Sequence, residues 1–108
     1  MTDDQGTWHE AAALGALNEG EPYGIEIGRH HVALYRVGNE YYATSNICTH
    51  AEALLSDGIL EGCEIECPLH MGRFDIRTGE ALTSPVEIDI QTYPVRVAGD
   101  RLEVCLPA

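Results

Sequence analysis

A chain of 108 residues holds enough apolar side chains for one hydrophobic core, so we expect a single domain over residues 1–108. Its 18 acidic residues face six arginines and no lysine, and the net charge of −12 excludes nucleic acid as a partner, because phosphate binding needs cations. No apolar run reaches the roughly 18 residues that span a membrane, and the acidic N-terminus lacks the features of a secretory signal, so we expect a cytoplasmic protein without membrane contact.

The first half of the chain favours one short helical segment followed by strands. Alanine and leucine are frequent in Trp8–Leu17 after a polar start, which predicts one or two short helical turns. A strand is expected at Tyr23–Ile27. The β-branched and aromatic runs His31–Val37 and Tyr41–Ser45 are separated by Gly38-Asn39-Glu40, a pattern typical of a β-hairpin.

The second half combines another hairpin with a long segment of different composition. Tyr93–Ala98 and Arg101–Leu106 flank a glycine–aspartate turn and alternate apolar with polar residues, as strands with one buried face do. Residues 46–90 are rich in glycine, proline and acids, with short candidate strands only at Glu64–Glu66 and Arg73–Ile76. We therefore predict an all-β fold, an antiparallel β-sandwich scaffold with a loop-rich subdomain inserted at about residues 46–90.

Four residues in that segment have the chemistry and spacing of a metal site. Cys48 and His50 are two residues apart, and Cys67 and His70 are three apart, so each pair fits one tight turn. Soft thiolates and imidazoles suit zinc or an iron–sulfur cluster. Zinc fingers usually group the cysteines in one pair and the histidines in another, whereas here each loop carries one of each. The pattern favours a binuclear 2Fe–2S cluster with two histidines on one iron, and a structural zinc site is the alternative.

The two remaining cysteines, Cys63 and Cys105, are expected to be free. A reducing cytoplasm disfavours a disulfide between them, and each can serve as a small apolar side chain. Cys63 precedes Cys67 by four residues, but no matching spacing supports it as a further ligand. No serine has a recognisable basic partner for nucleophilic catalysis. We therefore expect an electron-transfer protein with no catalytic site of its own.

Beyond the ligands, the chain resembles the Rieske ferredoxins over nearly its whole length. The stretch Cys67–Asp75 is similar to the second cluster loop of that family, and Pro85 is similar to part of the third loop, which covers the cluster. Trp8 and the segment Tyr93–Val97 also fit the family pattern. The resemblance implies a Rieske-like β-sandwich that holds one Rieske-type 2Fe–2S cluster.

The family pattern also implies a role for each ligand. Cys48 and Cys67 would bind the inner iron, while His50 and His70 would bind the outer iron near the surface, where the electron leaves. Several side chains would shield the cluster, namely Ala51, Leu55, Leu69, Met71 and Pro85.

Residues near the ligands place the chain in the low-potential branch of the family. High-potential Rieske proteins of respiratory cytochrome bc complexes carry a disulfide between the loops, but Ala53 and Leu69 occupy the corresponding positions here. Gly72 and Phe74 replace a serine and a tyrosine whose hydroxyls bond to cluster sulfurs in those proteins. Without these hydroxyls and with carboxylates nearby, we expect a reduction potential of about −150 mV, near the low end of the Rieske range.

The resemblance implies the ferredoxin component of a multicomponent aromatic-ring-hydroxylating dioxygenase. It would act as a monomer and carry single electrons from a flavin-containing NAD(P)H-dependent reductase to a terminal Rieske oxygenase. Acidic charge would speed the encounter with a basic partner, although charge that serves solubility alone is an alternative. The carboxylates between the two ligand pairs, with no arginine among them, are Glu52, Asp57, Glu61, Glu64 and Glu66.

Two other functions stay open on the sequence. One is a small Rieske-like subunit of an assimilatory nitrite reductase, although many such subunits lack the ligand residues that this chain has. The other is a zinc-stabilised binding module without a redox role.

Overall fold

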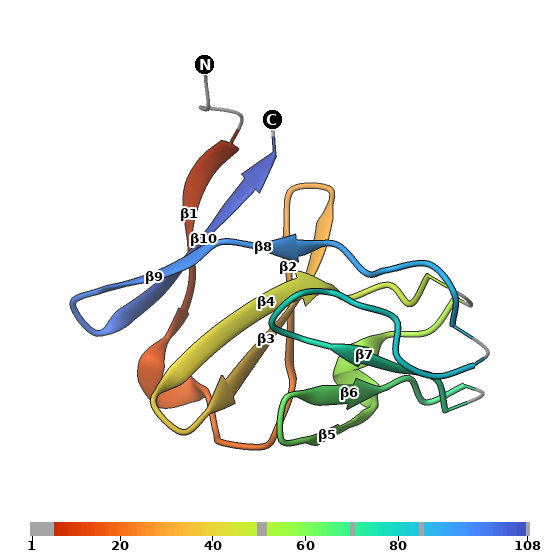
Figure 1. Cartoon of the computed structure of the whole chain (residues 1–108). Coiled ribbons are helices and arrows are strands. Elements are labelled where there is room, and N and C mark those ends of the chain that lie inside the picture. Colours follow the sequence, from red (N-terminus) through yellow and green to blue (C-terminus); the bar gives the residue numbers. More distant parts are fainter. Residues whose placement is uncertain (1–5, 50–51, 70, 85, 108) are drawn as a thin grey trace.

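The computed structural model describes residues 6–49, 52–69, 71–84 and 86–107, which form three antiparallel sheets and two short 3₁₀ helices (Figure 1). The first sheet has the order β1 (Gly6–Ala13), β10 (Arg101–Pro107), β9 (Val95–Ala98). The second has the order β2 (Tyr23–Ile27), β3 (His30–Val37), β4 (Glu40–Ser45), β8 (Thr92–Tyr93). The third has the order β5 (Ile59–Glu61), β6 (Glu64–Glu66), β7 (Arg73–Asp75). The 3₁₀ helices are η1 (Leu14–Ala16) and η2 (Leu55–Asp57), and no helix in the described ranges is long and apolar enough to cross a bilayer.

The predicted antiparallel β fold is confirmed. The hairpin predicted around Gly38 joins β3 to β4 with Val37 opposite Glu40, so Gly38 and Asn39 form the turn. Gly38 has a φ of 61°, a conformation that glycine adopts without steric cost. The short strands predicted near the second ligand pair are present as β6 and β7, whereas β5 was missed.

Pro94 divides the predicted strand Tyr93–Ala98 between two sheets. Tyr93 pairs with β4, whereas Val95 pairs with β10. Proline has no N–H to donate to a ladder, and the Pro94 carbonyl accepts the N–H of Cys105 at 2.9 Å. The chain therefore passes from the second sheet into the first at this residue, where β8 is followed by β9 (Figure 1).

Of the one or two short helical turns predicted within Trp8–Leu17, the structure has one, and most of the segment is a strand instead. Only Leu14–Ala16 are helical, and Gly6–Ala13 form a strand that pairs with β10 at the other end of the chain. The helix preference of alanine amounts to tenths of a kcal/mol per residue, and tertiary pairing overrides it. The strand also places the Trp8 ring beneath the guanidinium of Arg96, 4.1 Å from the ring centroid.

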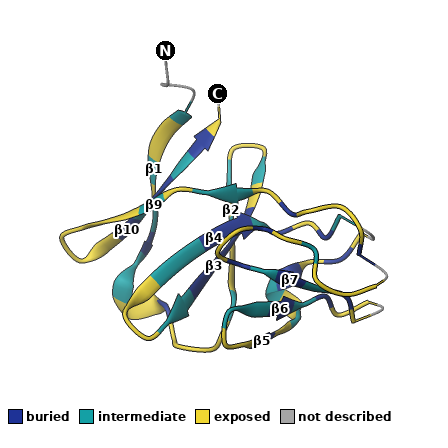
Figure 2. Ribbon diagram, viewed as in Figure 1, coloured by how far each residue is buried: buried dark blue, intermediate teal, exposed yellow. Residues whose placement is uncertain are grey.

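Strand β3 lies between the two hydrophobic cores, and both of its faces are therefore buried. Val32 and Leu34 belong to the core that joins the first and second sheets, whereas Ala33 and Tyr35 belong to the core that joins the second sheet to the third. All four are fully buried, in contrast to the exposed hairpin turns (Figure 2). The Tyr35 hydroxyl is satisfied by the Oγ1 of Thr44 at 2.9 Å. One core therefore supports the scaffold, and the other supports the segment with the predicted metal ligands.

Candidate metal centre

The two predicted ligand loops are closed by equivalent backbone hydrogen bonds. The N–H of Cys48 donates to the carbonyl of Ala53 at 3.0 Å, and the N–H of Cys67 donates to the carbonyl of Gly72 at 2.8 Å. In each loop the cysteine bonds to the residue five positions later, so each pair of ends is held across four residues. His50 and His70 belong to these four-residue segments and lie outside the described residues. Cys48 and Cys67 are therefore placed at matching positions at the base of their loops.

The thiols of Cys48 and Cys67 lie side by side in the core that joins the second sheet to the third. Their residues are 4% and 0% exposed, and they share this core with Leu55 and Phe74. Burial, followed by a hydrogen bond with the Cys48 thiol, raises the pKa of Cys67 to about 11. Thiols deprotonate when they bind a metal, so the raised pKa means that a cation must compensate the charge of Cys67 before its thiolate forms at neutral pH. Two adjacent sulfur donors shielded from water fit one iron of an iron–sulfur cluster.

Asn46 anchors the first loop to the scaffold through both its backbone and its side chain. Its N–H donates to the carbonyl of His31 and its carbonyl accepts the N–H of Leu55, each at 2.8 Å. Its side chain accepts the N–H of Ser56 at 2.8 Å and donates to the Ser56 hydroxyl at 3.0 Å. The residue is 4% exposed, so these bonds satisfy polar groups that have little access to water. The role of Asn46 was not predicted from the sequence, because a lone asparagine near a cysteine does not indicate its partners.

A third loop, defined here as residues 82–84 and 86–90, is bonded to the first ligand loop and to the start of the strand that follows the second. The hydroxyl of Thr49 in the first loop donates to the carbonyl of Ile88 at 2.8 Å. After the second loop, the N–H of Arg73 donates to the hydroxyl of Thr83 at 2.9 Å. Val86 is 5% exposed and belongs to the core that holds the cysteines. Pro85, which the family pattern places in this loop, lies outside the described residues.

Gly72 is packed so closely against Val86 that it has no room for a side chain. A Cβ at Gly72 would be 2.6 Å from the Cγ1 of Val86 and 3.1 Å from its Cγ2. Phe74 is fully buried in the same core. The two positions expected to lack hydroxyls are therefore in tightly packed apolar surroundings, and the valine that excludes a serine from position 72 was not predicted.

The predicted shielding side chains have different environments. Leu55 is fully buried beside the cysteines, whereas Leu69 is 47% exposed and Met71 is 67% exposed. Met71 has a backbone φ of 61°, which residues other than glycine rarely adopt. The second loop is therefore strained at the position after His70. Ala51 lies outside the described residues.

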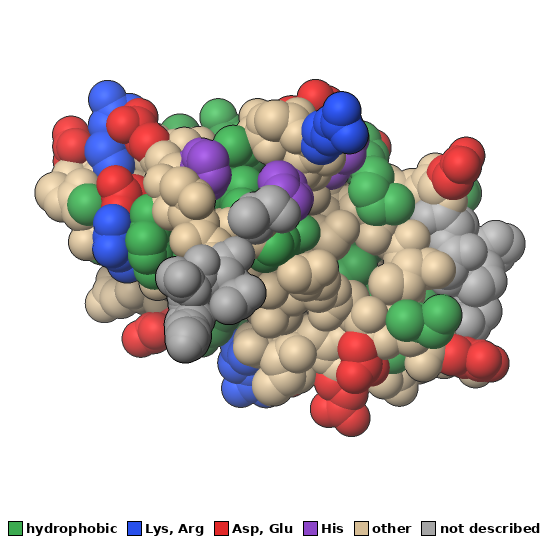
Figure 3. All heavy atoms as spheres, turned by 90° about the horizontal axis from the view of Figure 1, so that it is seen from above, with side chains coloured by type: hydrophobic (Ala, Val, Ile, Leu, Met, Phe, Trp, Pro, Cys, Tyr) green, Lys and Arg blue, Asp and Glu red, His purple; other side chains and the backbone are tan. Residues whose placement is uncertain are grey.

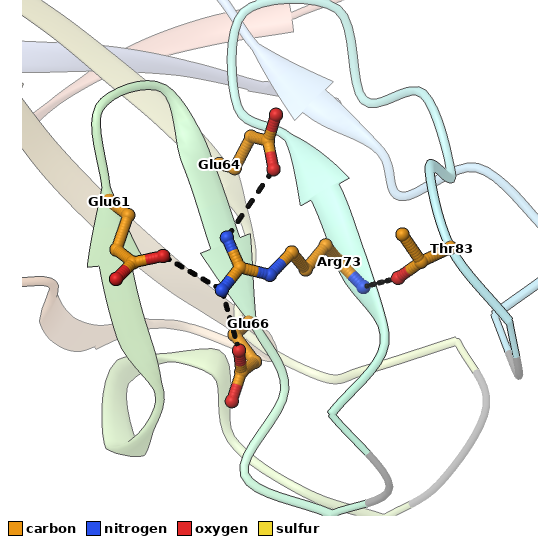
Figure 4. A network of polar contacts seen from close by, with 5 residues as sticks. All are labelled: Glu61, Glu64, Glu66, Arg73 and Thr83. Atoms are coloured by element: carbon orange, nitrogen blue, oxygen red, sulfur yellow. Dashed lines mark hydrogen bonds and ion pairs between the residues drawn. The ribbon is translucent and has the colours of Figure 1, made fainter.

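Three of the five carboxylates between the ligand pairs are close to an arginine from outside that segment. Glu61, Glu64 and Glu66 all lie within ion-pair distance of Arg73, which comes from a different strand (Figure 4). The sequence did not predict this contact, because the second ligand pair separates the three glutamates from Arg73 along the chain. Glu52 and Asp57 have no ion-pair partner among the residues that the structure describes.

The other histidines do not form a second site within the described ranges. The histidines of these ranges are visible on one face of the molecule (Figure 3). His30 contacts Tyr93 edge to face at 6.4 Å between ring centroids, and the Nδ1 of His31 is 3.6 Å from Glu26. No group of three or more histidine, cysteine or acidic side chains in the described segments is arranged to hold a metal ion. The free state predicted for Cys63 and Cys105 agrees with the structure, in which all four cysteines are unbridged.

Comparison with known proteins indicates an iron–sulfur protein, as the buried thiol pair does. The family described as "Rieske [2Fe-2S] domain" matches residues 7–94. The ferredoxin component of the naphthalene 1,2-dioxygenase system of Pseudomonas aeruginosa is 52% identical over 99 residues, which are 92% of this chain and 95% of that protein. The solved ferredoxin of carbazole 1,9a-dioxygenase from Nocardioides aromaticivorans IC177 has a TM-score of 0.88 and 38% identity, over 94% of this chain and 99% of that one.

Two further solved structures bear on the alternatives. A ferredoxin in complex with the oxygenase of carbazole 1,9a-dioxygenase is 36% identical, with a TM-score of 0.85 over 90% of this chain and 91% of the matched one. A putative NADH-dependent nitrite reductase small subunit from Mycobacterium tuberculosis has the same TM-score of 0.85 at 26% identity, over 97% and 99% of the two chains. Backbone similarity is therefore shared by both classes, whereas sequence identity is higher with the ferredoxins.

The hydrogen bonds of Asn46 generate a prediction about the first loop. Asn46→Ala should lower the free energy of unfolding by about 1–3 kcal/mol, because the N–H of Ser56 loses its acceptor in a buried setting. Urea unfolding followed by circular dichroism measures the loss. Asn18→Ala is the matched control, since the exposed Asn18 makes one side-chain bond to Glu21, and it should change stability by less than about 0.5 kcal/mol. Equal stability of the two variants would contradict the anchoring role.

Proposed function

Because the chain belongs to the Rieske [2Fe–2S] domain family, we propose that it is the ferredoxin component of an aromatic-ring-hydroxylating dioxygenase system. One Rieske-type 2Fe–2S cluster accepts one electron and releases it again. Cys48 and Cys67 hold the inner iron, and His50 and His70 hold the outer iron. The chain itself carries no catalytic site and passes electrons to an enzyme that does.

The observation that carries this proposal is the pair of buried thiols on two equally closed loops. Each loop supplies one cysteine at its base and one histidine within its four-residue segment, which suits a binuclear cluster better than a single zinc ion. The 52% identity with a dioxygenase ferredoxin favours this system over the nitrite reductase class, which is represented at 26% identity.

The three loops carry exposed apolar side chains and carboxylates, and we infer that electron-transfer partners dock on these loops. Leu69 and Met71 of the second loop are exposed, as is Ile88 of the third at 67%. Glu52 of the first loop and Glu87 of the third have no ion-pair partner in the described parts of the chain. Apolar contact would exclude water during transfer, and the carboxylates would attract a basic rim on the partner.

The partners are a terminal oxygenase and a flavin-containing NAD(P)H-dependent reductase. The ferredoxin relative bound to its oxygenase supports the first of these. The reductase follows from the electron balance, because the oxygenase receives single electrons and NAD(P)H delivers a hydride. We further propose that the protein is a monomer and that it is cytoplasmic, a reducing compartment in which four unbridged cysteines are expected.

Reconstitution tests this function. We expect the iron-loaded, red-brown protein to transfer electrons from a flavin reductase that oxidises NADH to the terminal oxygenase of a naphthalene dioxygenase system. Hydroxylation of naphthalene is the readout. Cys67→Ser should abolish coupling, because it removes a cluster ligand, whereas Cys63→Ser should retain it. Hydroxylation that is equally fast without the chain, or support of nitrite reduction by a sirohaem enzyme instead, would contradict the proposal.

The same assay tests the docking surface. The transfer rate should fall as ionic strength rises, because salt screens exposed charges beyond about 10 Å at 0.1 M. Glu52→Gln with Glu87→Gln should weaken that salt dependence. A rate that is indifferent to salt would show that apolar contact alone governs docking.

The close packing of Gly72 changes how the low potential is tested. Gly72→Ser alone would displace Val86, so the informative comparison is Val86→Ala with and without Gly72→Ser and Phe74→Tyr. The added hydroxyls should raise the reduction potential above that of Val86→Ala, because hydrogen bonds to sulfur stabilise the reduced cluster. Protein-film voltammetry measures this difference. An unchanged potential would refute the hydrogen-bond account, and a parent potential above about +100 mV would exclude the low-potential class.

A further inference from the structure

Arg73 binds three carboxylates with one guanidinium. Its Nη2 lies 2.8 Å from Glu61 Oε1 and 2.9 Å from Glu66 Oε1, and its Nη1 lies 3.4 Å from Glu64 Oε1 (Figure 4). The Arg73 side chain is 26% exposed and that of Glu66 is 17% exposed, so this part of the group is shielded from water. Charges that are partly shielded interact more strongly than exposed pairs do.

The register of the third sheet explains why a cation is needed there. Glu61 is directly opposite Glu64, and Glu64 is directly opposite Asp75. Like charges in such positions destabilise a sheet. Arg73 is opposite Glu66 on the same outer face and reaches across to the carboxylates of both other strands. Without it, three carboxylates would repel one another across β5 and β6.

The backbone of Arg73 connects this sheet to the third loop. Its N–H donates to the hydroxyl of Thr83 at 2.9 Å, and its carbonyl accepts the N–H of Leu82 at 2.8 Å. Strand β5 follows the first ligand loop through η2, β6 leads into Cys67, and β7 leaves the second loop. Arg73 therefore contacts segments that continue from all three loops around the proposed cluster.

We propose that Arg73 is a positioning residue for electron transfer, which holds these three loops together and sets the reduction potential through its positive charge. The inference rests on the proposed cluster and adds a role for a side chain that is not a ligand. Reduction adds negative charge to the cluster, so nearby uncompensated carboxylates disfavour it. Arg73 offsets three of them and thereby keeps the potential higher than the sequence charge alone would allow.

Reduction potentials of matched variants test the proposal. Arg73→Gln should shift the potential to a more negative value than in the parent protein, and Glu61→Gln should shift it to a more positive value. Glu61 is exposed, so its variant preserves the test if Arg73→Gln fails to fold. Arg77→Gln is the control, because among the residues that the structure describes Arg77 pairs with Asp75 alone and makes no bond to Thr83. Its shift should be smaller than that of Arg73→Gln.

The conservative variant Arg73→Lys separates charge from geometry. A lysine retains the charge but not the planar fork that reaches several carboxylates. We expect a potential close to that of the parent, with faster loss of the visible cluster spectrum on heating. Equal shifts in Arg73→Gln and Arg77→Gln, no shift in Glu61→Gln, or parental cluster retention in Arg73→Lys would overturn the inference. A colourless parent protein would instead overturn the proposed function itself.

Discussion

The burial of two cysteine thiols side by side is the constraint on which the rest of this structure depends. Cys48 and Cys67 have almost no contact with water, and burial holds the pKa of Cys67 well above its ordinary value. A Cys67 thiolate is therefore disfavoured in this core without a bound cation. The loops must therefore be held in place by bonds other than those to a metal. Backbone bonds across each loop, the side chain of Asn46 and the contacts of Arg73 supply them.

The scaffold places this pair by giving β3 two buried faces. One face packs on the sheet that contains both ends of the described chain, and the other packs on the core that contains the thiols. The cysteines thus belong to the hydrophobic interior, while the loops beyond them reach the surface with exposed Leu69 and Met71. This arrangement suits a protein that must protect a cofactor and still bring it close to a partner.

Local patterns were sufficient to predict the parts of the fold that local chemistry determines. The glycine–asparagine turn predicted the hairpin of β3 and β4, and the spacing of Cys48 and Cys67 from their histidines predicted two equivalent loops. Contacts between distant segments could not be predicted in this way. The strand at Gly6–Ala13 depends on pairing with β10, and the ion pairs of Arg73 depend on the register of three short strands. The Gly72–Val86 contact likewise joins two loops whose approach no local pattern indicates.

The proposed ligand set is tested most directly by pulsed EPR of the reduced protein with nitrogen-15 in its histidines. Two imidazole nitrogens coupled to the cluster spin are predicted, and the couplings should lose one partner in His50→Ala or His70→Ala wherever the cluster persists. A paramagnetic cluster without histidine couplings would indicate all-cysteine ligation. A protein that binds zinc and gives no signal would contradict the account altogether.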